Sequence, residues 1–127
     1  MMTMTTSRSP RDSAAPAPPA SGSTIVGVFR ETARTHPTRP ALRWREGAAW
    51  RSLSWGQYEQ SVTGVANALR NWGLLPGERV GILATNRPQW HIADIATMAA
   101  GLVSVPVYPS NAASQVRYVL GHSGARV

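Results

Sequence analysis

The chain has 127 residues, of which 43% are apolar and 15% are charged, a composition typical of an ordinary globular segment and not of a fibrous chain. It contains no cysteine, which excludes disulfides, thiolate nucleophiles and cysteine-based metal sites, and no apolar run approaches the roughly 20 residues that cross a bilayer. The thirteen cationic side chains are all arginine and the formal net charge is +7, but the arginines are spread along the chain instead of clustering as in a nucleic-acid-binding patch.

Residues 1–23 differ in composition from the rest and are rich in proline, alanine, serine and threonine. They carry too little large apolar surface to offset the entropy of ordering them, so we expect a disordered tail. Proline and serine interrupt the apolar core that a secretory signal needs, and the prolines oppose the helix of a transit peptide. We therefore expect a cytoplasmic protein, and the sequence leaves peripheral membrane association open.

The ordered part begins with a predicted helix capped by Ser23 or Thr24. Its apolar face comprises Ile25, Val28, Phe29, Thr32 and Ala33. His36-Pro37 ends this helix, because the residue before a proline is pushed out of the helical region. Leu42 and Trp44 then alternate with arginines, Glu46-Gly47 supplies a turn and residues 50–53 return, a pattern that predicts a β-hairpin with one apolar face.

A second, longer helix should start at Ser54, which forms a capping-box pattern with Gln57. Gly73 follows it, where a left-handed residue often ends a helix. We expect one continuous buried stripe, formed by Tyr58, Val62, Val65, Leu69 and Trp72.

Two strands joined by a helix come next. The turn Leu75-Pro76-Gly77-Glu78 leads into a strand over residues 79–84. Asn86-Arg87-Pro88 opens a helix whose body, residues 90–100, is apolar on nearly every side and should be deeply packed. Residues 102–107 form the near-continuous apolar run of a parallel strand covered on both faces, with Pro106 near its end or on an edge.

The last predicted helix starts with a cap at Ser110 or Asn111 and ends within residues 121–124. Its inward residues are Val116, Val119 and Leu120. Residues 125–127 read as the beginning of a further strand. The fold class is therefore α/β, a partial parallel sheet with βαβ crossovers plus an N-terminal helix and β-hairpin. Ligands of such sheets bind beyond the carboxyl ends of the strands, so residues 85–88 and 108–111 are the loops to examine.

Five segments, in this order and spacing, resemble the opening of the AMP-binding, adenylate-forming enzymes. They are Ser52-Leu53-Ser54-Trp55-Gly56-Gln57-Tyr58, Leu75-Pro76-Gly77-Glu78-Arg79-Val80-Gly81-Ile82, Asn86-Arg87-Pro88-Gln89-Trp90, the run from Ala99 through Val105-Pro106-Val107-Tyr108-Pro109, and Ser123-Gly124-Ala125-Arg126-Val127. The Val-Pro-Val-Tyr-Pro wording, followed by residues 114–120, is most similar to long-chain acyl-CoA synthetases. The resemblance covers residues 24–127, which we interpret as the incomplete N-terminal part of an adenylate-forming large domain.

The resemblance implies a two-step ligase. A fatty acid carboxylate attacks the α-phosphate of ATP, giving an acyl-adenylate and pyrophosphate, and the thiol of coenzyme A then takes the acyl group. Magnesium accompanies the ATP, and such chemistry depends on backbone donors and cations around the phosphates.

Several of the family's ATP-handling parts have no counterpart in this sequence. These parts are a Ser/Thr/Gly-rich loop ending in Pro-Lys-Gly, an acidic segment for the ATP ribose, a metal-binding glutamate and a C-terminal catalytic lysine, and the chain contains no lysine at all. We therefore expect no catalytic residue in this chain, no binding of ATP, Mg²⁺ or coenzyme A by it alone, and no synthetase activity of the isolated polypeptide.

One local site follows from the resemblance. In relatives, the loop after the strand matching residues 103–107 lies beside the tunnel for the pantetheine arm of the thiol, which places Tyr108, Pro109 and Ser110 at the tunnel rim. The alternative is that Tyr108 covers the sheet end and Pro109-Ser110 merely starts a helix. Asp94, on an apolar helix, is interpreted as a structural carboxylate without a catalytic role.

Other chemistries lack support. His36, His91 and His122 have no ligand-type partner at helix spacing, so no metal site is expected, and no serine lies in a Gly-x-Ser-x-Gly elbow. Two alternative functions stay open: a self-standing α/β interaction module, and a basic nucleic-acid-binding fragment, although we expect no nucleic-acid partner. Acyl-chain length and oligomeric state are undecided, and the same opening could precede a fatty-acyl-AMP ligase or a carboxylic acid reductase.

Overall fold

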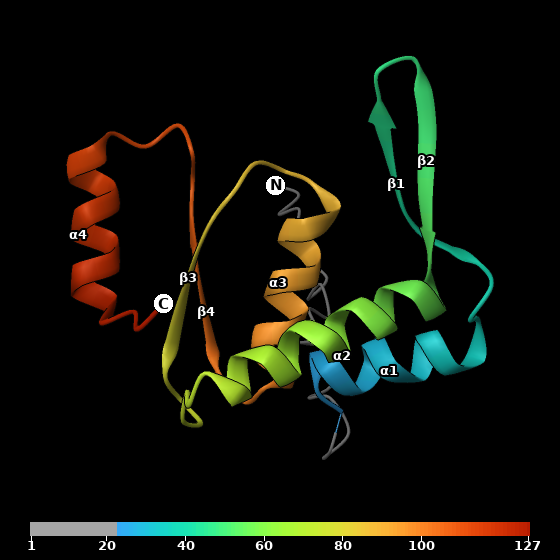
Figure 1. Cartoon of the computed structure of the whole chain (residues 1–127), viewed down its shortest axis with the longest axis horizontal. Coiled ribbons are helices and arrows are strands. Elements are labelled where there is room, and N and C mark those ends of the chain that lie inside the picture. The colour runs from blue at the N-terminus through green and yellow to red at the C-terminus, as the bar shows by residue number, and fades with distance from the viewer. Residues whose placement is uncertain (1–22) are drawn as a thin grey trace, which may run out of the picture.

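The computed structural model describes residues 23–127, so the expectation of disorder lies outside the described residues except at Ser23. The elements in chain order are α1 (Ile25–Thr35), β1 (Pro40–Glu46), β2 (Ala49–Ser54), α2 (Trp55–Asn71), β3 (Arg79–Leu83), α3 (Pro88–Ala99), β4 (Val103–Val107) and α4 (Ala113–Ser123). α1 and α2 lie side by side below a projecting β1–β2 hairpin, and the β3–β4 pair stands between α3 and α4 (Figure 1). The α/β fold with hairpin and parallel βαβ unit is confirmed.

The predicted caps of the first two helices are present. The Thr24 hydroxyl accepts a hydrogen bond from the backbone N–H of Gly27 at 3.0 Å. At α2, the Ser54 hydroxyl accepts from the Gln57 N–H at 3.2 Å, and the Gln57 side chain accepts from the Ser54 N–H at 2.9 Å. Both starts therefore satisfy backbone donors that have no partner inside the helix.

The core lies where α1, α2 and α3 meet the lower ends of the two parallel strands. Phe29 and Tyr58 pack edge to face there, with ring centroids 4.8 Å apart. The buried cluster comprises Phe29, Tyr58, Val62, Ala66, Leu69, Val80, Ala96, Ala100 and Leu102.

Some residues that were predicted to lie on the buried faces of α1 and α2 are exposed. On α1, Ile25 and Val28 are 64% and 58% exposed. On α2, the buried stripe runs through Ala66 instead of Val65, and Trp72 is 67% exposed because it caps the helix end instead of facing the core. Steps of four along a 3.6-residue turn rotate the stripe gradually, and alanine fits where α2 and α3 approach closely.

β3 and β4 pair in parallel, with Arg79 opposite Val103 and Leu83 opposite Val107. The chain end adds to the other edge of β3: the Gly81 N–H donates to the Val127 carbonyl at 2.6 Å, and the Arg126 N–H donates to the Arg79 carbonyl at 2.8 Å. The predicted beginning of a third strand is thus confirmed, and β3 lies between two parallel neighbours.

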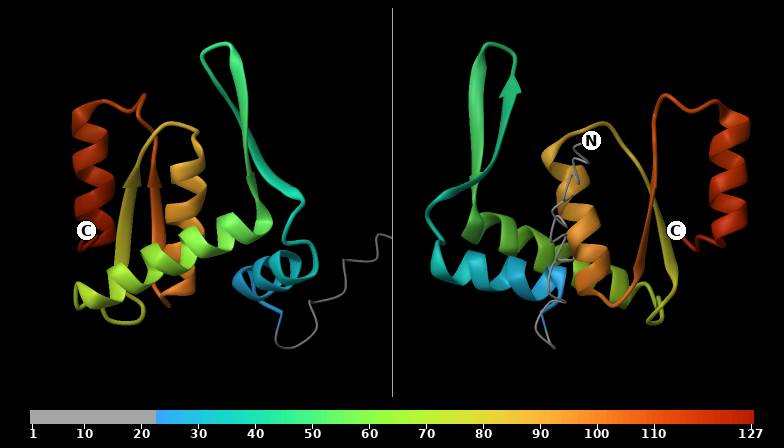
Figure 2. Two further views of the ribbon diagram at one scale, coloured as in Figure 1. Left: turned by 45° about the vertical axis from the view of Figure 1, so that its right-hand side comes forward. Right: turned by 180° about the vertical axis from the view of Figure 1, so that it is seen from behind.

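α3 and α4 cover opposite faces of this sheet (Figure 2). α4 comes so close to β3 that a Cβ atom on Gly81 would lie 2.5 Å from Cδ2 of Leu120. The Arg79 guanidinium donates from Nε to the Ser123 carbonyl at 2.8 Å, which satisfies one backbone acceptor at the C-terminal end of α4. β3, through the bare backbone of Gly81 and the side chain of Arg79, therefore determines where α4 packs on the sheet.

Three expectations for this half need correction. β4 is not covered on both faces, since Val103 is 48% exposed and Pro106 is also exposed. α4 begins after Ala112, not after Ser110 or Asn111, and its inward residues Val116, Val119 and Leu120 are half-buried, with no fully buried residue in the helix. Along α3, full burial is confined to Pro88 and the residues near its C-terminal end, because within residues 23–127 no further element packs on the outer side of β4.

Within residues 23–127, no helix combines the length and apolarity needed to cross a membrane.

Replacing Ser54 by alanine tests the capping box. We expect the free energy of unfolding to fall by about 1 kcal/mol, because the Gln57 N–H loses its acceptor at the start of α2. Urea denaturation of both proteins measures it. Ser52→Ala, on an exposed position of β2, is the matched control and should change stability little; equal losses in the two variants would contradict the cap.

Candidate functional site

A cavity of about 560 Å³ opens beyond the carboxyl ends of β3 and β4. Parallel strands end at the same edge of a sheet, so the loops that follow them meet there. The lining residues are Ala84, Thr85, Asn86, Trp90, Pro106, Val107, Tyr108, Pro109 and Ser110. Both loops singled out from the sequence, residues 85–88 and 108–111, contribute to this wall.

The three residues predicted at a tunnel rim, Tyr108, Pro109 and Ser110, all line this cavity. Tyr108 is 72% exposed, so its ring covers no sheet end within the described chain. Val107, the preceding residue, is buried at 3% exposure and anchors the loop in the sheet. The geometry places these residues at the cavity, and whether they contact a ligand stays a prediction.

Sequence reasoning missed Trp90 as a wall residue. Trp90 lies in the first turn of α3, where its N–H donates to the Arg87 carbonyl at 3.0 Å. The half-buried indole faces the cavity from the helix start, opposite the loop that follows β4. The signal for it was the proline at the first helical position, because that residue places Trp90 at the sheet's carboxyl edge.

A hydrogen-bonded chain supports the cavity from behind. The Asn86 side-chain carbonyl lies 3.2 Å from Nε2 of His91, and the His91 ring packs edge to face on Trp90 with centroids 5.2 Å apart. The Tyr58 hydroxyl donates to the His91 backbone carbonyl at 3.0 Å. α2 therefore holds the start of α3, which in turn fixes Asn86 and Trp90 in the cavity wall.

Asp94 has a structural environment, as interpreted from the sequence. Its carboxylate accepts a hydrogen bond from the Ser104 hydroxyl at 2.6 Å, which ties the middle of α3 to β4. Burial raises the pKa of Tyr58 to about 12, and the negative charge of Asp94 adds to this shift.

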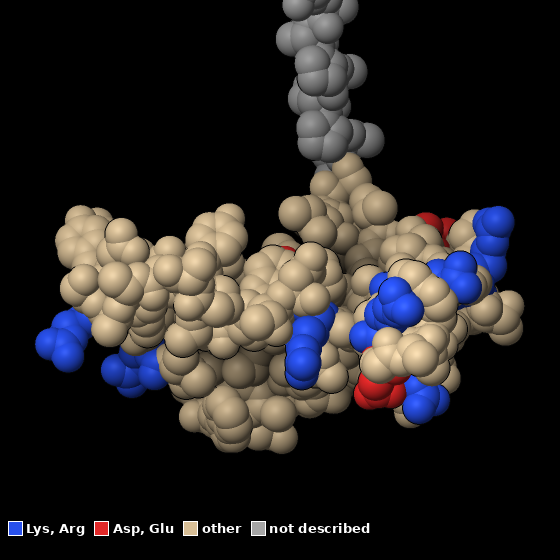
Figure 3. Space-filling model, turned by 90° about the horizontal axis from the view of Figure 1, so that it is seen from above, with Lys and Arg blue, Asp and Glu red and all other residues tan. Residues whose placement is uncertain are grey.

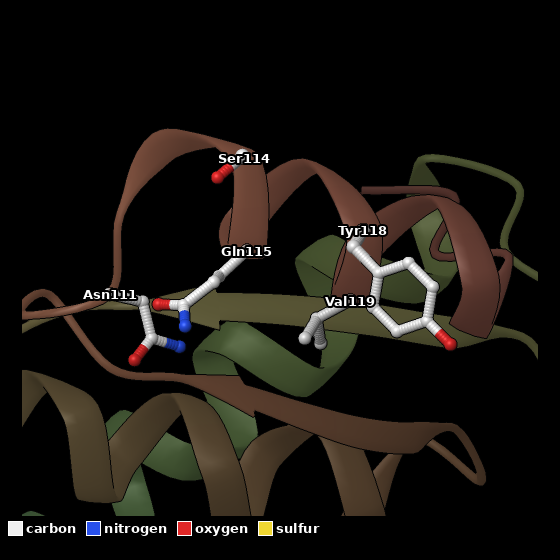
Figure 4. A pocket seen from close by; sticks show the side chains of 5 residues that line it. All are labelled: Asn111, Ser114, Gln115, Tyr118 and Val119. Carbon is white, nitrogen blue, oxygen red and sulfur yellow. The ribbon is translucent and has the colours of Figure 1, made fainter.

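A second cavity, of about 380 Å³, lies along α4. Ser114, Gln115, Tyr118 and Val119 line it from the helix, with Asn111 from the preceding loop (Figure 4). The Gln115 side chain is already engaged, since its carbonyl accepts from the Ala112 N–H at 3.0 Å and closes the start of α4. This cavity has no charged wall and is the weaker candidate for chemistry.

Nothing in the described residues shows a site for ATP or its magnesium ion. Across residues 23–127, no three histidine or acidic side chains gather where they could hold a metal ion. No lysine is available for the phosphates. No step on the nucleotide is assigned to this chain's residues.

Comparison with known proteins gives a consistent match. A family model described as AMP-binding enzyme matches residues 29–127. The chain is 37% identical over 101 residues to the long-chain-fatty-acid–CoA ligase heimdall of Drosophila melanogaster, covering 76% of this chain and 15% of that protein. It is 33% identical over 104 residues to the human long-chain-fatty-acid–CoA ligase ACSBG2, covering 82% of this chain and 16% of that protein.

Similarity also extends to other adenylate-forming proteins. Surfactin synthase subunit 1 of Bacillus subtilis is 30% identical over 104 residues, which is 82% of this chain and 3% of that protein. Among solved structures, the N-terminal subdomain of Klebsiella oxytoca NpsA superposes with a TM-score of 0.73 at 27% identity, covering 80% of this chain and 26% of that one. The chain thus spans only a small part of the length of these relatives.

The raised pKa of Tyr58 predicts a pH dependence of stability. The folded protein favours the neutral phenol, so this contribution is fully present below the unfolded pKa of about 10 and is lost as the pH rises through about 12. We expect the free energy of unfolding, measured by denaturant titration, to fall over this range. Tyr58→Phe should lack this part of the fall; an unchanged pH profile in the variant would show that Tyr58 is not the group responsible.

Proposed function

The chain belongs to the AMP-binding enzyme family, and on this basis we propose that it forms the N-terminal part of an ATP-dependent acyl-CoA synthetase that acts on fatty acids. The observation that carries the proposal is the match of residues 29–127 to the family, combined with 37% identity to a long-chain-fatty-acid–CoA ligase. The Val-Pro-Val-Tyr-Pro segment, residues 105–109, supports the fatty acid assignment.

In this proposal the chain's own contribution is to the thiol step. The thiol attacks the acyl carbon of the acyl-adenylate, loses its proton and displaces AMP. The cavity at the sheet edge would admit the flexible arm that carries the thiol, with Tyr108, Pro109 and Ser110 at the rim. Aromatic walls from Trp90 and Tyr108 exclude water from one side of such an arm, and the Asn86 amide offers polar contacts for its amide groups.

The remaining parts of the reaction belong to sequence that this chain does not contain. Leu83 and Val103 are 54% and 48% exposed on the sheet, and Leu75 is 66% exposed in the turn before it. Exposed apolar residues at a sheet edge favour a partner surface, as expected when a larger domain continues the sheet.

A carrier-protein thiol is the second candidate acceptor. It is favoured by the similarity, at 27% identity, to an artificially fused adenylation–PCP di-domain of Klebsiella oxytoca, in which the adenylation domain is joined to a carrier domain. Both acceptors present a thiol on a long arm, so the same cavity suits either. Assays must therefore offer coenzyme A and a pantetheine-bearing carrier protein in parallel.

The isolated chain should form neither acyl-adenylate nor thioester. It supplies no lysine and no described metal-binding cluster for the nucleotide step. ATP–pyrophosphate exchange and thioester formation with palmitate measure the two steps separately. Turnover of either step by the purified 127-residue chain would overturn this expectation.

The cavity rim is tested in a chimaera in which residues 24–127 replace the matching segment of the Drosophila ligase. We expect Ser110→Trp to lower thioester formation at least tenfold while ATP–pyrophosphate exchange persists, because a bulky rim blocks the thiol and not the nucleotide. Thr63→Trp, at an exposed position of α2 that lines neither cavity, is the matched control. Equal loss of both steps, or no loss in either, would contradict the assignment of the rim.

A further inference from the structure

The β1–β2 hairpin is the most basic projecting element of the described chain. It stands away from the three-helix core in every view (Figures 1 and 2). Residues 40–54 carry three arginines and one glutamate, a net charge of +2. Seen from above, several blue side chains lie at the hairpin side of the molecule, with red ones beside them, and others lie at the opposite end (Figure 3).

The strand register divides the hairpin into two faces. Arg45 lies opposite Trp50, and Arg43 lies opposite Ser52, so these four residues share one face. Leu42, Leu53 and the half-buried Trp44 belong to the other face. Arg43, Arg45 and Trp50 therefore lie on the same face because side chains alternate between the two faces of a strand, whatever rotamers they adopt.

The basic face is exposed, and Arg43 and Arg45 also line a cavity of about 560 Å³ together with residues 86–89 at the start of α3. Trp50 is 66% exposed although it is the largest apolar side chain on that face, and Arg43 and Arg45 are exposed beside it. The single acid of the hairpin, Glu46, is engaged by Arg51, with Nε and Oε2 2.9 Å apart. Among residues 23–127, neither Arg43 nor Arg45 has an ion-pair partner.

We propose that this face, formed by Arg43, Arg45 and Trp50, docks the protein on an anionic lipid surface. Tryptophan and arginine both have an apolar body and a polar group, and both settle at the level of the headgroups. The hairpin ends in the two-residue turn Gly47-Ala48, so its tip can approach a membrane plane before any other described element does. The proposal depends on register and charge, not on the acyl-CoA assignment.

A lipid surface fits this face better than a nucleic acid does. A nucleic-acid footprint needs basic residues along a groove and several aromatic rings on which successive bases stack. This face has one exposed ring and two arginines without an ion-pair partner among residues 23–127, spread along a narrow hairpin that ends in a two-residue tip. A tip of this kind reaches into an interface, where each basic side chain near an anionic surface contributes about a fivefold gain in affinity.

Co-sedimentation of the full chain with vesicles tests the proposal. We expect binding to phosphatidylcholine vesicles that contain phosphatidylglycerol, weak binding to phosphatidylcholine alone, and loss of binding as salt rises. The double variant Arg43→Gln, Arg45→Gln should bind roughly thirtyfold more weakly. The control Arg30→Gln, Arg117→Gln removes two exposed charges elsewhere and should bind within a fewfold of the unchanged chain.

Trp50→Ala isolates the aromatic contribution. It should weaken vesicle binding several-fold, whereas Trp72→Ala removes an equally exposed indole, at 67%, from α2 and should not. Far-ultraviolet circular dichroism confirms that each variant is folded. Equal losses in the hairpin and control pairs, or tighter binding of the same face to an oligonucleotide than to vesicles, would overturn the proposal.

Discussion

The parallel pairing around β3 is the constraint on which the rest of the structure depends. β3 receives β4 on one edge and residues 125–127 on the other. Connections between such strands must cross over a face of the sheet, which places α3 and α4 on opposite faces. Because all strands point the same way, their following loops meet at one edge, and the cavity with Trp90 and Tyr108 is the result.

Much of this architecture could be predicted because local signals agreed with the fold. The Ser54 and Gln57 capping box, the glycine and proline turns and the apolar run at β4 each specify a boundary within a few residues. The burial of individual side chains could not be predicted equally well. Trp72 and Val103 have apolar side chains and are nevertheless exposed. Exposure depends on which other element packs against a residue, and the local sequence does not specify that. α4 begins later than predicted. The Gln115 side chain accepts a hydrogen bond from the Ala112 N–H at the helix start, so no serine cap is needed.

The candidate site shows the same division. Strand direction predicted that residues 85–88 and 108–111 would meet at one edge, and the family resemblance singled out Tyr108, Pro109 and Ser110 within the second loop, which line the cavity. Asn86 belongs to the loop 85–88 indicated by the sequence and Trp90 follows Pro88 at the helix start, but the contact that holds them, from Tyr58 to His91, joins residues more than thirty positions apart. Pairing across that distance leaves no local pattern in a single sequence. The role of the cavity in a thiol step rests on family resemblance, whereas its position rests on geometry.

The central claim is that β3 is an interior strand with parallel neighbours on both edges. Nuclear magnetic resonance of the isotopically labelled chain tests it through couplings across hydrogen bonds. The account predicts a coupling from the Gly81 amide to the Val127 carbonyl, and cross-strand contacts that pair Arg79 with Val103 and Leu83 with Val107. An antiparallel contact pattern, or a Gly81 amide that exchanges with solvent as fast as an unbonded one, would contradict it.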